Sequence, residues 1–344
     1  MKFIKSPETF RVEEVLQPQL GDGKYYYYVL EKSGISTHNA VKLLERQNDT
    51  RIYVSGLKDA AATALQWICA EKKLVNSDKR MELLFMGNSS KRIYVGMHNS
   101  NKFSVVLADI SDDEGKFLEK ELRKMRLPNY FGEQRFSART LEIAEFMLQE
   151  KWKEAVKAAL TESSEFESEK SKMIKKIIAG KWGKWKELSE NKELPIPKRM
   201  IFELLDTEED FRKAFELLPR KAVGIYCRAC QGLKFNEMLA MEIDKQKQKR
   251  QKYVLVAGRK LPVVFKYKAL KRGLEIAGIF PSRTVLKRKT FFVPKNLKIE
   301  PMEKSHEGKE SAGKSAKLMF ELRKGCYATL LVKCAMALSG SAGK

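Results

Sequence analysis

The chain has 344 residues, of which 43% are hydrophobic and 32% are charged, and its formal net charge is +23. This length suffices for two domains, or for one domain with a large insertion. The charge favours an anionic partner such as a nucleic-acid backbone, the alternative being a lysine-rich proteome. No stretch approaches the roughly 20 apolar residues of a membrane-spanning helix, and the N-terminus lacks a signal-peptide core. We therefore expect a cytoplasmic protein without a membrane segment.

The first part of the chain predicts a sheet with a few helices. Alternating or β-branched segments predict strands at residues 3–15, 25–31, 51–54, 81–86, 92–96 and 102–107. Ser36 or Thr37 can cap a helix. The spacing of Ala, Leu and Trp after the third of these strands favours another helix, which would begin near Asp59 or Ala60. A charged helix is expected at 113–126.

The middle of the chain has a helical pattern, and strands return near its end. The elements expected after residue 140 are helices over most of 142–218, strands at 253–256, 261–265 and 317–322, and an apolar helix at 328–338. A basic run at 244–252 is either a solvated helix face or a surface that contacts RNA.

Two short motifs suggest sites that their surroundings do not support. Cys227 and Cys230 form a single CxxC pair, whereas a structural zinc ion needs four ligands. We therefore expect reduced thiols without a metal. Residues 308–315 match the phosphate-loop pattern GxxxxGK[ST], which requires a buried strand before it and a helix after it. The preceding residues are polar and include Pro301, so an RNA-dependent NTPase is a minor hypothesis that rests on this segment alone.

A carboxylate follows the strand predicted at 51–54. Ser55 and Gly56 form a turn after that strand, and Lys58 and Asp59 come directly afterwards. A turn at the end of a strand places the next side chains at a rim, where a ligand can reach them. A carboxylate beside a lysine can remain ionised there, which suits a nucleophile or a general base. The alternative is structural, because Asp at a strand-to-helix junction often serves only as the helix cap.

The segment at 128–136 groups aromatic and polar side chains around one glycine. Its sequence, PNYFGEQRF, contains two amides, three aromatic rings and an arginine. Proteins bind single-stranded bases by aromatic stacking, by amide hydrogen bonds to base edges and by arginine contacts to phosphate. The segment therefore suits nucleic-acid binding, or it is a turn whose aromatic rings pack inward.

An ordered series of motifs runs from residue 6 to residue 331. The motifs are SPETF at 6–10, GLKDAAATALQW at 56–67, GMHNSNKF at 96–103, NYFGEQRFS at 129–137, YCRACQGLKFN at 226–236 and FELRKGCYATLL at 320–331. Together they resemble the signature segments of the TruD family of tRNA pseudouridine synthases. The fourth motif matches the family pattern at eight of nine positions.

This resemblance implies an α/β (α+β) fold with a discontinuous catalytic domain. The pseudouridine synthase domain, on an antiparallel or mixed sheet, would comprise residues 1–145 and 291–344. A mainly helical α+β insertion domain of the TruD type would occupy 146–290. The resemblance also implies that residues 302–316 are a loop before a core strand, which argues against a working phosphate loop.

The resemblance implies the chemistry as well. Pseudouridine formation breaks the C1′–N1 bond of uridine, turns the base and rejoins it through C5, without a metal or another cofactor. The target lies in folded RNA and must be flipped into a pocket. Asp59 would be the catalytic residue, either as a covalent nucleophile or as a base at C2′. The family target is uridine 13 of tRNA.

Further site residues follow from the same resemblance. Phe131 would stack on the flipped base or its sugar, and Asn129 would hold a polar edge. Lys5 could pair with Asp59. The other expected RNA-binding residues are Lys58, Gln134 and Arg135.

The chain departs from the family pattern at several positions. Ala60 and Ala61 replace residues that are often basic, and Arg228 and Gly232 stand where the family has serines. These departures keep open the alternative of a non-catalytic RNA-binding or RNA-folding protein on the same fold. In either case we expect tRNA or another structured RNA as the partner, with no obligate protein partner.

Overall fold

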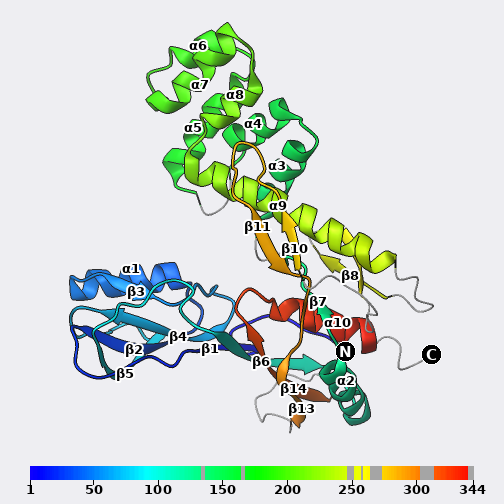
Figure 1. Cartoon of the computed structure of the whole chain (residues 1–344). Helices are drawn as coiled ribbons and strands as arrows, with labels where there is room; N and C mark the ends of the chain where they lie inside the picture. Colours follow the sequence, from blue (N-terminus) through cyan, green and yellow to red (C-terminus); the bar gives the residue numbers. More distant parts are fainter. Residues whose placement is uncertain are drawn as a thin grey trace. The chain divides into compact units, whose positions relative to one another are not determined.

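The computed structural model describes residues 1–132, 136–163, 167–245, 252–256, 259–263, 273–302 and 314–339. The chain divides into two compact units. The first unit comprises Met1–Asn129, Val263–Tyr267 and Phe291–Lys344, and the second comprises Tyr130–Pro262 and Lys268–Thr290. Figure 1 shows that the first unit is built on a large sheet and the second on helices.

The first unit contains an eight-stranded sheet of order β13-β14-β6-β1-β4-β2-β5, in which β3 pairs with β4. Its strands are β1 (Phe10–Val15), β2 (Tyr25–Lys32), β3 (Ile52–Val54), β4 (Thr63–Ala70), β5 (Met81–Ser89), β6 (Ser100–Ala108), β13 (Lys295–Met302) and β14 (Ser315–Arg323). The β1–β4 pair is parallel and the other pairs are antiparallel. This mixed sheet, together with the helices, confirms the expected α/β class.

Apolar clusters cover both faces of the sheet around β2. Successive side chains of a strand point to opposite faces, and the neighbours Tyr27 and Tyr28 accordingly belong to different clusters. Tyr28 packs in the cluster that includes Leu44 of helix α1 (Thr37–Asn48). Tyr27 packs with Trp67 of β4 on the other face. With both faces covered, the central strands have a fixed register.

The segment after Asp59 forms strand β4 and not the helix that its apolar spacing predicted. All five residues from Gln66 to Ala70 are buried, because this part of β4 pairs with β2 on one side and, from Ile68, with β3 on the other, and its two faces are covered. A strand that is buried on both faces lacks the alternation of a half-exposed strand, so its sequence resembles that of a buried helix. Consequently Asp59 does not cap a helix, and the structural alternative for this residue is wrong.

The strand predicted at 92–96 is also wrong. This segment turns, with a hydrogen bond of 3.1 Å from Met97 N to Tyr94 O and a positive φ of 90° at Gly96. Ile93 is buried, whereas Tyr94 is exposed. The β-branched and aromatic residues of this segment are typical of a strand, and for this reason the sequence predicted one, although the backbone turns here. Of the strand predicted at 3–15, residues 10–15 form β1, whereas residues 7–9 form a turn. The other strands predicted in this unit are confirmed.

Helix α2 (Asp112–Lys124) covers the free edge of the sheet at β13. Glu119 accepts a hydrogen bond of 2.6 Å from Ile299 N, and Arg123 Nε donates one of 2.8 Å to Leu297 O. The two side chains also form an ion pair of 2.7 Å. Edge strands present unpaired backbone groups, and this helix satisfies two of them. The C-terminal helix α10 (Ala328–Ser339) packs against α2 and completes this end of the unit.

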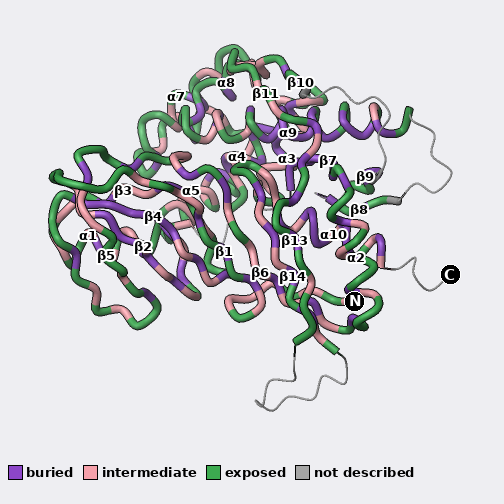
Figure 2. The backbone as a smooth tube through the Cα atoms, turned by 60° about the horizontal axis from the view of Figure 1, so that its bottom comes forward, coloured by how far each residue is buried: buried purple, intermediate pink, exposed green. Residues whose placement is uncertain are grey.

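The second unit is mainly helical, as the pattern predicted. Its helices are α3 (Ala138–Leu148), α4 (Trp152–Thr161), α5 (Glu169–Gly180), α6 (Trp185–Ser189), α7 (Ile196–Thr207), α8 (Phe211–Glu216) and α9 (Arg220–Asp244). The 25-residue helix α9 is buried over much of its length (Figure 2). Cys227 and Cys230 lie on its buried side as free thiols, and burial raises the pKa of Cys230 to about 12.

Short two-stranded sheets complete the structure. They pair β8 (Lys252–Val256) with β9 (Arg259–Val263), β10 (Gly273–Ile276) with β11 (Leu286–Lys289), and β7 (Leu127–Pro128) with β12 (Phe291–Phe292). The strands expected near 253 and 261 are thus confirmed, whereas β10 and β11 were not predicted. None of the described helices is long and apolar enough to cross a membrane.

The two compact units meet in the sequence after Asn129, so residues 130–145 belong to the second unit. Their helix α3 packs on α9, which explains why they do not join the sheet. The naming of the units as catalytic domain and insertion domain remains a prediction. Most of the phosphate-loop match, most of the polar segment at 302–316 and most of the basic run at 244–252 lie outside the described residues.

Candidate active site

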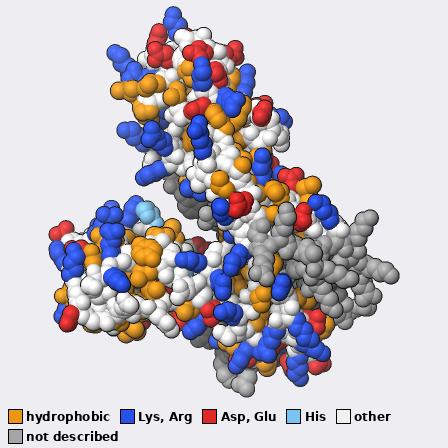
Figure 3. Space-filling model, viewed as in Figure 1, with side chains coloured by type: hydrophobic (Ala, Val, Ile, Leu, Met, Phe, Trp, Pro, Cys, Tyr) orange, Lys and Arg blue, Asp and Glu red, His pale blue; other side chains and the backbone are white. Residues whose placement is uncertain are grey.

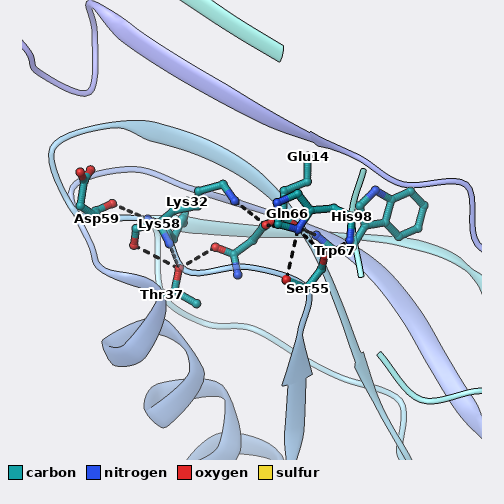
Figure 4. A network of polar contacts seen from close by, with 9 residues as sticks. All are labelled: Glu14, Lys32, Thr37, Ser55, Lys58, Asp59, Gln66, Trp67 and His98. Carbon is teal, nitrogen blue, oxygen red and sulfur yellow. Dashed lines mark hydrogen bonds and ion pairs between the residues drawn. The ribbon is translucent and has the colours of Figure 1, made fainter. Parts of the chain in front are cut away.

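Asp59 lies in the loop that connects the antiparallel strands β3 and β4, and polar contacts bind this loop along its length (Figure 4). The contacts begin at Ser55, which is fully buried. Its N–H donates to Trp67 O at 3.0 Å, and its carbonyl accepts from Gly96 N at 2.7 Å. Its hydroxyl contacts His98 Nδ1 at 2.9 Å and accepts from His98 N at 3.0 Å. The start of the loop is therefore fixed to two separate segments, β4 and the turn at 96–98.

A buried ion pair lies beneath the loop. Lys58 turns inward and its ammonium group pairs with Glu14 Oε1, while Glu14 Oε2 accepts from Trp67 N at 3.0 Å. The carboxylate is fully buried and the Lys58 side chain is 11% exposed. A Cβ atom at Gly56 would lie 2.3 Å from Glu14 Oε1, so only glycine leaves room for this pair. The structure thus gives Lys58 a partner inside the protein, and its expected contact with RNA stays a prediction.

The start of helix α1 binds both backbone polar groups of Lys58, its N–H and its carbonyl oxygen. Thr37 N donates to Lys58 O at 3.0 Å, and Lys58 N donates to Thr37 Oγ1 at 2.8 Å. The same hydroxyl donates to Gln66 Oε1 at 2.7 Å. Since Thr37 is the first residue of a helix that Ser36 caps, the helix start anchors the residue before Asp59.

Asp59 itself is anchored through its backbone and through one carboxylate oxygen. Its side chain is 49% exposed, and Oδ2 pairs with the ammonium group of Lys5. The expected pairing of these two residues is therefore present. Lys5 in turn lies 5.0 Å from the centre of the Phe10 ring. Oδ1 has no hydrogen-bond partner within the described part of the chain, so it can meet a ligand from solution.

Lys32 holds the main chain of Asp59 from inside the protein. It lies at the end of β2 with no exposed surface, and its Nζ donates to Asp59 O at 2.7 Å and to Ile35 O at 2.6 Å. Burial is the main cause that lowers the pKa of Lys32 to about 8; the charge of Asp59 opposes this shift, and the charges of Lys58 and Lys5 contribute to it. The sequence did not predict a role for Lys32, since nothing in the local pattern marks a lysine at the end of a strand as buried.

His98 closes the inner end of the network. Burial lowers the pKa of the imidazole below its ordinary value; the carboxylate of Glu14, 3.9 Å away, opposes this shift, while Lys58 and Lys324 add to it. Lys324 reaches this corner by donating to Gly96 O at 2.6 Å. The histidine therefore serves as a neutral hydrogen-bonding group beside an ion pair.

The other predicted site segment is packed in a different manner. Asn129 is buried and ends the first unit, whereas Phe131 is buried in the second. The backbone of Phe131 exchanges two hydrogen bonds with the Asn236 amide, at 2.7 and 3.0 Å. The Arg288 guanidinium lies over its ring, 4.1 Å from the centre, and the ring of Phe235 meets it edge-on. The aromatic side chain therefore packs inward, which was the structural alternative for this segment.

Of the predicted site residues, the structure brings together Asp59, Lys5 and Lys58. Gln134 and Arg135 lie outside the described residues. Within the described ranges, no group of three or more His, Cys, Asp or Glu side chains is arranged to hold a metal ion. What this site offers is a half-exposed carboxylate on a fixed backbone, surrounded by lysines.

The sequence of this chain is similar to those of proteins described as tRNA pseudouridine synthase D. A family model described as tRNA pseudouridine synthase D (TruD) matches residues 1–257. A protein of Aquifex aeolicus described as tRNA pseudouridine synthase D is 27% identical, over 97% of this chain and 97% of its own. A protein of Methanococcus maripaludis described as a probable tRNA pseudouridine synthase D is 30% identical, over 70% of this chain and 65% of its own.

A solved structure supports the fold. The crystal structure of a protein from Methanosarcina mazei that is described as a TruD protein matches with a TM-score of 0.65. The match covers 98% of this chain and 94% of the other, at 20% sequence identity. The helices and strands of this chain are therefore arranged as in that crystal structure.

Proposed function

This chain belongs to the TruD family of tRNA pseudouridine synthases, and we propose from this membership and from the Asp59 site that it isomerises a uridine of tRNA to pseudouridine. The reaction breaks the C1′–N1 bond and forms a C1′–C5 bond; N1 gains a proton and C5 loses one. Reactant and product are isomers, so the balance needs no oxidant, reductant or co-substrate. A single carboxylate can serve such a reaction.

The proposal rests on one observation: the side chain of Asp59 is exposed while its backbone is held in place. Its carboxylate is half-exposed, while Lys58 before it is tied to Thr37 and Glu14 and its own carbonyl is tied to Lys32. Catalytic groups work best when they are held in place before the substrate arrives. With Oδ2 held by Lys5, Oδ1 is the oxygen that would attack the substrate or remove the proton at C2′.

Phe131 and Asn129 are proposed to contact the flipped nucleotide, Phe131 through its ring and Asn129 through its amide. Phe131 is only 7% exposed, and the Arg288 guanidinium and the Phe235 ring pack against its side chain. A base can stack on this ring only when the guanidinium moves away or shares the stack. Gln134 and Arg135 are proposed to bind the RNA nearby.

The tRNA backbone is the proposed partner of the positive charge. Figure 3 shows Lys and Arg side chains over the part of the surface where Figure 1 draws α2. Lys116, Lys120 and Lys124 of this helix are exposed at intervals of one helical turn, although the helix also carries acidic residues. No ion pair is found for these three side chains within the described residues. Like charges at this spacing weaken a helix, and phosphate groups would relieve the repulsion. A cytoplasmic location belongs to the same proposal.

The direct test is to incubate the purified protein with unmodified tRNA transcripts and to map pseudouridine chemically. The expected product is pseudouridine at position 13, and a transcript with cytidine at that position is the control. Product at another uridine would change the proposed position but leave the reaction intact. Binding of tRNA without any product would favour the alternative of a non-catalytic RNA-binding or RNA-folding protein.

A further inference from the structure

We propose that Lys32 is a positioning residue for the reaction, and that its ammonium group holds the main chain of Asp59 in the orientation that the carboxylate needs. This inference rests on the proposed function of Asp59. It concerns a residue that would touch neither the substrate nor the reacting atoms. Lys32 acts on the carboxylate through the backbone, whereas Lys5 acts on it directly.

The geometry shows a lysine that is used as an internal tether. In the register of the sheet, Lys32 lies opposite Ala64 on β4 and opposite Met81 on β5, so its strand neighbours are apolar. Its Nζ reaches across the loop to carbonyl oxygens of two segments, Ile35 before α1 and Asp59 before β4. One ammonium group therefore joins the catalytic loop to the turn that leads into the first helix.

A purely structural role does not account for a charge at this position. Burying an ammonium group costs free energy, and apolar residues of similar size often stabilise a protein as well as a buried charge does. The cost here is increased by two further cations, Lys5 and Lys58, which face the same region. The carboxylate of Asp59 is the charged group that offsets it. A costly buried cation whose ammonium group binds the main chain of Asp59 therefore indicates a role in holding that carboxylate.

The protonation state of Lys32 should therefore affect turnover. Burial lowers its pKa to about 8, so the side chain carries its charge at neutral pH and loses it in mildly alkaline solution. Hydrogen bonds from a charged donor are roughly twice as strong as those from a neutral one. Loss of the proton weakens both bonds to the carbonyl groups and releases the Asp59 main chain. The charged groups that face Lys32 are Asp59, Lys58 and Lys5.

The test compares Lys32→Met and Lys32→Arg with the unchanged protein, using Lys42→Met on the exposed face of α1 as the matched control. The measurements are tRNA affinity and the single-turnover rate constant at saturating protein, from about pH 7 to about pH 9, one unit on either side of that pKa. We expect Lys32→Met to lower the rate constant about 10²-fold, the effect of a misplacement of about 1 Å, with unchanged affinity.

The pH profiles give the readout that a structural role would not change. The unchanged protein should lose rate as the pH rises through about 8, and Lys32→Met should lack this step. Lys32→Arg, which stays charged, should keep more activity than Lys32→Met and should also lack the step. A Lys32→Met variant with the normal rate and the normal alkaline step would overturn the inference. If this variant does not fold, a flat profile of the unchanged protein through pH 8 overturns it equally.

The same experiment separates this inference from the proposed function. An unchanged protein that forms no pseudouridine at any pH refutes the proposed function. An active protein whose rate does not depend on Lys32 refutes the inference alone.

Discussion

The loop of Asp59 and the segment of Phe131 are held by opposite means. Hydrogen bonds and ion pairs hold the backbone of the loop and leave the Asp59 carboxylate 49% exposed. Aromatic packing and the Asn236 amide hold Phe131, which is 7% exposed. The polar tethers act on backbone groups and on Oδ2 of Asp59 and leave Oδ1 available, whereas apolar packing occupies the whole Phe131 ring. In the proposed function, Asp59 can therefore meet the substrate as it stands, whereas Phe131 must first be uncovered.

The largest expected effect comes from removing the exposed carboxylate. Asp59→Ala should abolish turnover, because the chemistry depends on one group. Affinity for tRNA should stay near normal, since it arises from many phosphate contacts. Chemical mapping and a filter-binding titration measure the two quantities. Pseudouridine formed by the purified variant would contradict the assignment of Asp59.

Removing the buried ring should instead affect stability. Phe131→Ala should reduce the free energy of unfolding of the second unit by about 3–5 kcal/mol, the usual cost of replacing a buried Phe. Phe117→Ala on α2 is the control, because that ring is 41% exposed and its loss should cost about 0.5 kcal/mol or less. Urea unfolding followed by tryptophan fluorescence measures both. Equal losses would show that the packing around Phe131 is not specific.

The tethers beneath Asp59 can be weakened without touching the carboxylate. Glu14→Gln should cost about 3 kcal/mol, because it leaves the Lys58 ammonium group without its buried counter-ion. Glu31→Gln is the matched control, since Glu31 pairs with Arg11 at the surface and contributes about 1 kcal/mol or less. Denaturant unfolding of both variants gives the comparison, and similar losses would argue against a structural role for the buried pair.

The smallest expected effect is a change in acid sensitivity at His98. Its folded-state pKa lies below the ordinary value of 6.5, so the unfolded chain binds the proton more readily. The corresponding stability is complete above pH 6.5 and is lost as the pH falls through the folded-state pKa. His98→Gln should therefore be less sensitive to acid than the unchanged protein, and His38→Gln on the exposed side of α1 should not be. Unfolding midpoints measured at decreasing pH provide the test.

The sequence predicted the elements of the second unit better than the centre of the sheet. Helices such as α4 have one apolar face, and their periodicity is visible in the residues themselves. Strand β4 is buried on both faces, and its neighbours β1 and β2 come from elsewhere in the chain. Local spacing cannot show those neighbours, which is why this strand was predicted as a helix.

The same distinction applies within the candidate site. The motifs drew attention to Asp59, and resemblance to the family pointed to Lys5. Lys32 was missed because it reaches Asp59 only after β2 and β4 have paired, with Lys32 opposite Ala64. Glu14 was missed for a similar reason, since its partner Lys58 lies 44 residues away in the chain. Long-range sheet register, rather than local pattern, determines which charges meet beneath the loop.

The cover that α2 provides over β13 has a consequence for self-association. Because Glu119 and Arg123 occupy backbone groups of β13, a second molecule cannot readily add a strand there. The opposite border of the sheet, β5, presents Leu84 at 61% and Phe85 at 50% exposure. Strand-by-strand aggregation of this protein would therefore start at β5, and a lysine in place of Leu84 is the substitution that should suppress it.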